Sequence, residues 1–185
     1  TLHNTLFPYT TLFRSRGGRA VTASAISDNP NAAGWIERAK EYIDALVPRI
    51  WAEDGSPVSG PHYVSTQADP LINMVLPLYY AGEMPPVQKK YPRIRRFARH
   101  LIDRPTPPDR RVGHTRILPT IGHTRLEHPR NIGKYAVLMG LTDPKLAGEA
   151  YWMWKRAGQA TSGFMEGVYY MHERFDERQP DLGSV

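Results

Sequence analysis

The chain has 185 residues, enough for one domain of ordinary size. Its 24 Lys and Arg residues outnumber its 18 Asp and Glu residues, and the net charge of +6 favours an acidic partner: an anionic polysaccharide, a nucleic acid or an anionic surface. The chain has no cysteine, which excludes disulfides, thiol catalysis and thiolate zinc sites, and no apolar run of about twenty residues, so we expect no membrane span.

The first fifteen residues differ in origin from the rest of the chain, as their sequence indicates. Residues 5–15 read TLFPYTTLFRS, which resembles the conceptual translation of a widely used sequencing adapter. Pro8, Thr10 and Thr11 interrupt the apolar core that a signal peptide requires. We therefore expect residues 1–15 to be non-native, and the chain to be a gene fragment whose true beginning is lost.

A small and polar stretch, residues 16–30, predicts a loop before the first helix. Apolar side chains then recur at three- and four-residue spacing, which predicts a helix that Pro48 should kink or shorten. This apolar stripe consists of Ile36, Ala39, Ile43, Leu46, Val47 and Ile50. Residues 53–63, rich in Gly, Pro and Ser, predict a loop.

The next two helices differ in polarity. Asp69 followed by Pro70 is typical of a helix start and predicts an almost wholly apolar helix that ends near Gly82. A third helix is predicted from Gln88 to Asp103, with six basic residues. A nucleic-acid interface is one interpretation of this helix. No helix-turn-helix spacing precedes it, so we favour a solvated outer helix and expect no nucleic-acid partner.

The remainder alternates between loops and short helices. Residues 105–130 show no clear period and predict a long loop. A short helix is predicted at residues 133–141, and Asp143-Pro144 predicts the start of another. Residues 173–185 suggest a frayed or truncated end. The fold class expected is all-α, with helical hairpins stacked on one another.

Three motifs carry a resemblance to a known family. The loop 54–63 reads DGSPVSGPHY, residues 116–123 read RILPTIGH, and residues 143–147 read DPKLA. In this order and spacing they resemble the toroid domain of heparinase II/III-like and alginate-lyase-like polysaccharide lyases, over residues 33–158. The resemblance implies a partial (α/α) toroid over residues 31–172, and a secreted or periplasmic protein that needs no cofactor.

The implied reaction is β-elimination on a uronic-acid polysaccharide. A base removes the proton at C5, donors neutralise the adjacent carboxylate, and an acid protonates the leaving glycosidic oxygen. Tyr63 matches the family's catalytic tyrosine. Ser59 and Ser65 stand where relatives often carry a Glu and an Arg, and the upstream Asn–His pair of the family would fall within the adapter-like segment. For this reason we expect the fragment to be inactive.

Other candidate residues are basic. His62 lies beside Tyr63, and the repeated Gly-His-Thr-Arg sequence contributes Arg116, His123 and Arg125, which we expect to bind an anionic glycan. Three histidines between residues 114 and 128 could bind zinc, but their spacing fits no compact ligand motif, so no metal is expected.

Two other functions remain open. A non-catalytic toroid that binds glycans would tolerate Ser59, Ser65 and the missing neutralising pair. A toroid glycoside hydrolase would need two carboxylates across a cleft, for which Glu53 and Asp54 are the loop pair in view.

Overall fold

A computed structural model describes residues 28–119, 132–140, 142–158 and 175–181. Within these ranges the chain is helical and contains no strand, only two isolated β-bridges, Trp51 to Pro57 and Asp109 to Thr115. The all-α fold class is therefore confirmed for the described residues. Residues 1–27, which include the adapter-like segment, lie outside the described residues.

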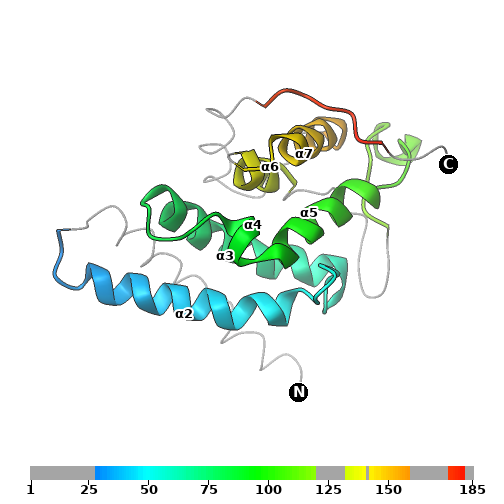
Figure 1. Ribbon diagram of the computed structural model, residues 1–185. Helices are drawn as coiled ribbons and strands as arrows, with labels where there is room; N and C mark the ends of the chain where they lie inside the picture. Colours follow the sequence, from blue (N-terminus) through cyan, green and yellow to red (C-terminus); the bar gives the residue numbers. More distant parts are fainter. Residues whose placement is uncertain (1–27, 120–131, 141, 159–174, 182–185) are drawn as a thin grey trace, which may run out of the picture.

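The first hairpin pairs α2 (Ala32–Ile50) with α3 (Gly60–Tyr80). All six residues of the predicted α2 stripe are buried, so the periodicity identified the face that packs on the core. Pro48 neither ends nor interrupts α2, which continues to Ile50. The chain reverses at the loop between the helices, and α3 runs back behind α2 (Figure 1).

The predicted start of α3, at Pro70 after an Asp69 cap, is wrong by ten residues. The helix begins at Gly60, with Pro61 in its first turn, and Asp69-Pro70 lies in its interior. Proline in a helix removes one backbone hydrogen bond, but Val64, Ala68 and Leu71 are fully buried around it, and this packing outweighs the local signal. Gly82 does follow the C-terminus as predicted. Its φ of +74° and the bond from Glu83 N to Leu78 O (2.9 Å) form a Schellman motif.

The single helix predicted from Gln88 to Asp103 is divided in two. α4 (Val87–Lys90) ends at Lys90, Tyr91 lies between the two helices, and α5 (Pro92–Asp103) begins at the proline that follows. Proline disfavours helical geometry in the preceding residue, and Tyr91 accordingly leaves it, with φ −128° and ψ 73°.

The C-terminal hairpin consists of α6 (Ile132–Gly140) and α7 (Pro144–Arg156). The predicted N-cap of α7 is confirmed, since the Asp143 carboxylate accepts a hydrogen bond from Leu146 N. Helix α5 packs against both helices of this hairpin. The long loop holds a short 3-10 helix, η1 (Arg110–Val112), while residues 120–131 lie outside the described ranges.

Residues 175–181 form an extended segment, here named the strap, along α7 (Figure 1). Arg178 N donates to Gly148 O (3.2 Å), and the Phe175 ring lies against Gly140 and Tyr151. The strap is the part of the expected frayed or truncated end, residues 173–185, that the structure describes. Glycine at positions 140 and 148 leaves room for the strap, because a Cβ there would overlap Phe175 or the Asp176 carbonyl.

One hydrophobic core joins all these helices. An aromatic row crosses it: Trp51 contacts Phe97, and Phe97 contacts Tyr135, each pair with ring centroids 5.5 Å apart. The row connects the end of α2 with α5 and α6.

Candidate functional site

Tyr63 lies in the first turn of α3 and is 37% exposed. It is one of three large hydrophobic side chains that the described surface exposes, and Val58 in the preceding loop is another. The N-cap residue Ser59 makes no capping bond, and its hydroxyl instead lies 3.2 Å from Gln67 Oε1. The first turn contains no acidic residue, so its partial positive charge is not offset there.

The Asp54-Gly55 part of the motif is docked on α5. Gly55 has φ +83°, and a Cβ at this position would overlap the backbone of Arg96 and Phe97. Hydrogen bonding to Ser56, through its side chain first and through its backbone N (2.8 Å) second, holds the pKa of Asp54 below its usual range. Close packing on α5 thus explains why Gly55 is a glycine, and the hydrogen-bonded turn explains the presence of Asp54.

Glu53 and Asp54 do not form a hydrolase pair facing each other across a cleft. They are adjacent on one loop, and Glu53 forms an ion pair with Arg93. Arg93 also donates to Trp51 O (3.0 Å), and Arg96 donates to Glu53 O. These bonds hold the loop against α5.

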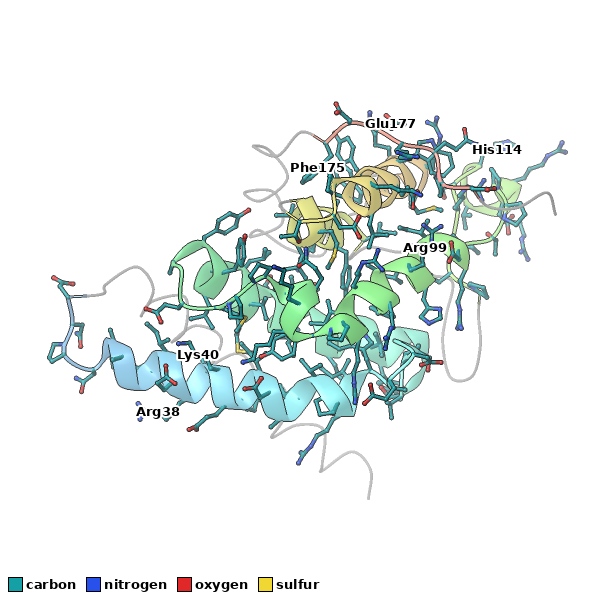
Figure 2. All side chains as sticks on the ribbon, viewed as in Figure 1. Arg38, Lys40, Arg99, His114, Phe175 and Glu177 are labelled. Carbon is teal, nitrogen blue, oxygen red and sulfur yellow. The ribbon has the colours of Figure 1, made fainter. Side chains whose placement is uncertain are left out.

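The basic residues of α5 have partners within the protein. Arg93 and Arg96 make the bonds to the loop described above. Arg95 forms an ion pair with Asp143 at the start of α7 (2.7 Å). Arg99 of α5, labelled in Figure 2, forms ion pairs with the buried Glu149 of α7 and with Asp103. The hydrogen bonds that Arg99 donates to the Asp103 carboxylate raise the pKa of the Arg99 guanidinium. The arginines connect α5 to its neighbours, and sequence periodicity could not have revealed those partners.

Arg116 is half-buried beside α7. Its guanidinium donates to Thr106 O (3.1 Å), and its Cζ lies 5.7 Å from the centroid of the Trp152 ring. Arg116 N donates to Arg156 O (3.4 Å), so the loop and the end of α7 are adjacent. His62 belongs to α3, but its side chain is outside the described set, as are His123 and Arg125 altogether. The predicted roles of His62, His123 and Arg125 therefore lie outside the described side chains.

The sequence analysis missed a buried ionic cluster between α3 and α6. Lys134, which is 1% exposed, forms an ion pair with Asp69. The neighbouring Tyr135 is fully buried, and burial together with the charge of Asp69 raises the pKa of its phenol. One signal for this cluster was present: Lys134 is the only charged residue in the apolar stretch IGKYAVLMG. Lys134 is enclosed while the Asp69 side chain is 24% exposed, so the ion pair connects α3 with α6 and its cation is not accessible to a polymer.

No group of three potential metal ligands occurs among the described residues, a search that did not include His123 or His128. Within the same ranges, no helix combines the length and the apolar character needed to cross a membrane. Comparison with protein-family models, with curated proteins and with solved structures finds no match to this chain.

Proposed function

We propose that the chain is the helical part, of (α/α) toroid type, of a polysaccharide lyase that cleaves a uronic-acid glycan by β-elimination. Tyr63 is the acid–base residue in this proposal. The observation that carries it is the placement of Tyr63, exposed in the first turn of α3, directly after the loop whose sequence resembles that of the lyases. By contrast, Tyr91 and Tyr135 are buried in the core.

The surroundings of Tyr63 suit an acidic substrate. β-Elimination increases negative charge on the uronic carboxylate, and stabilising groups must face that charge. The amino end of α3 carries partial positive charge and no carboxylate in its first turn. With an overall charge of +6, the protein also attracts anionic chains.

A glycan-binding protein without catalysis is the second candidate. Ser59, which replaces an acidic residue of the resembled motif, has its hydroxyl beside Gln67 and supplies no acid or base. Binding alone requires only cations and exposed apolar surface, and Val58 and Tyr63 contribute such surface.

Tyr63→Phe in the intact protein that carries this chain distinguishes the two. β-Elimination creates a double bond conjugated to the carboxylate, so the product absorbs ultraviolet light. Loss of the hydroxyl should lower the rate by about 10²–10⁴-fold. Tyr80→Phe is the matched control, since Tyr80 is 51% exposed at the other end of the same helix. Full activity of Tyr63→Phe refutes the role of Tyr63, and a wild type that forms no absorbing product from uronic-acid polymers favours the binding protein.

A further inference from the structure

Two arginines are held on one aromatic ring at the end of α7. The guanidinium carbons of Arg116 and Arg156 lie 5.7 and 5.3 Å from the centroid of Trp152. Trp152 is buried, so it provides a fixed support for both side chains. Cations fixed in this way lose less conformational entropy when an anion binds than free surface cations do.

A third cation lies next to this pair. Lys155 Nζ is 5.3 Å from the centroid of the Tyr151 ring, which itself stacks on Trp154. Lys155 and Arg156 remain 36% and 56% exposed, so both are accessible from solvent.

The strap places a carboxylate against these cations. Glu177 Oε2 lies 2.7 Å from Lys155 Nζ, and Glu177 Oε1 lies 3.9 Å from Arg156 Nη2. The two oxygens of one carboxylate thus face two different cations. The hydrogen bond from Lys155 is the main reason why the pKa of Glu177 is lowered. Figure 2 shows Glu177 and Phe175 on the strap that follows α7.

We propose that Arg116, Lys155 and Arg156 form a binding site for a carboxylate of an acidic glycan, and that Glu177 occupies this site as an internal competitor. The identity of the ligand rests on the proposed function, whereas the site rests on the contacts. Two of the cations face Glu177, and the third, Arg116, lies on the Trp152 ring that also supports Arg156, so the three cations exceed the single carboxylate and leave a surplus of positive charge for a polyanion.

Stabilisation of the helix end explains only part of this arrangement. Cations in the last turn of a helix interact favourably with its dipole, which accounts for a basic residue at 155 or 156. It does not account for Arg116, which comes from another segment, or for the ring that supports Arg116 and Arg156 together. Nor does it require a carboxylate from the strap.

Binding of polygalacturonate to this chain, measured by isothermal titration calorimetry at low salt, tests the proposal. Glu177→Gln removes the competing charge and preserves the shape, so affinity should rise about two- to fivefold, the range expected for an exposed charge pair. The gain should disappear at high salt. Adding Arg156→Gln to Glu177→Gln should abolish this gain in affinity, because one of the two cations that Glu177 had neutralised is then absent.

Asp176→Asn is the matched control. It changes the net charge equally, one residue away on the same strap, and the contact of Asp176 with α7 is made by its carbonyl. An equal gain with Asp176→Asn, or no gain with Glu177→Gln while the melting temperature is unchanged, overturns the proposal. An equal gain with polyglutamate overturns the assignment to a glycan and identifies an acidic peptide site instead.

This experiment fails or succeeds independently of the lyase. It measures equilibrium binding and requires no turnover. If Glu177→Gln strengthens binding while the intact protein forms no ultraviolet-absorbing product, the site stands and the lyase proposal falls. If the product forms but the affinity does not respond to Glu177→Gln, the lyase proposal stands and the site falls.

Discussion

Two lysine–carboxylate pairs in this protein serve different ends because they differ in burial. Lys134 meets Asp69 between α3 and α6, where Lys134 is 1% exposed. Lys155 meets Glu177 on the outer side of α7, where each side chain is about one-third exposed. Removing one partner from a buried pair leaves an uncompensated charge in the core, whereas water and salt replace a partner at the surface. The first pair therefore fixes the fold, and the second can exchange its carboxylate for another anion.

The largest effect should come from Asp69→Asn, which breaks the buried pair. Lys134 would keep its charge in an enclosed place and lose the Asp69 carboxylate, at a cost of about 3–5 kcal/mol in the free energy of unfolding. Urea denaturation followed by circular dichroism measures this cost. Asp69→Leu combined with Lys134→Met should recover most of it, because both polar groups are then removed together. A loss below about 1 kcal/mol for Asp69→Asn would remove the distinction between the pairs.

A smaller effect is expected from Gly148→Ala, which tests what holds the strap. The new Cβ would overlap the Asp176 carbonyl, so the strap or α7 must shift, at a cost of about 1–3 kcal/mol. Gly34→Ala is the control, since α2 has space at Gly34 and alanine favours helix there. Thermal melting compares the two variants. If both substitutions stabilise the protein, the strap is not held by close packing on α7.

The smallest effect is expected at Asp44, a carboxylate that accepts hydrogen bonds from Tyr91 and Lys90, and this effect depends on pH. Burial alone would raise the pKa of Asp44, but hydrogen bonds from Tyr91 (2.5 Å) and Lys90 outweigh it and lower that pKa. A lowered carboxyl pKa adds stability above the pKa of the unfolded state, about 3.9, and this stability is lost as pH falls through the lower folded value. Tyr91→Phe should therefore cost about 1 kcal/mol at pH 7 and less below pH ~4. A cost that stays constant from pH 7 to pH ~3 would show that Asp44 is not involved.

The sequence predicted the local features of the fold well. The α2 stripe, the Gly82 terminus and the Asp143-Pro144 start of α7 all follow from interactions within about one helical turn. The start of α3 was misplaced because Asp69-Pro70 is a strong local signal that packing around Ala68 and Leu71 overrides. The role of Tyr63 stays a prediction, since the structure places it on an accessible helix end without testing its chemistry.

By itself, then, the sequence determined that the chain is helical and which face of α2 is apolar, since both depend on spacing along the chain. The tertiary structure alone decided which charges meet. Lys134 and Asp69 are separated by 65 residues, and Lys155 and Glu177 by 22. The shared hydrophobic core brings Lys134 of α6 to Asp69 of α3, and the strap brings Glu177 to α7, and no periodicity encodes the resulting burial. Burial in turn decides which pair holds the fold and which can give way to a ligand.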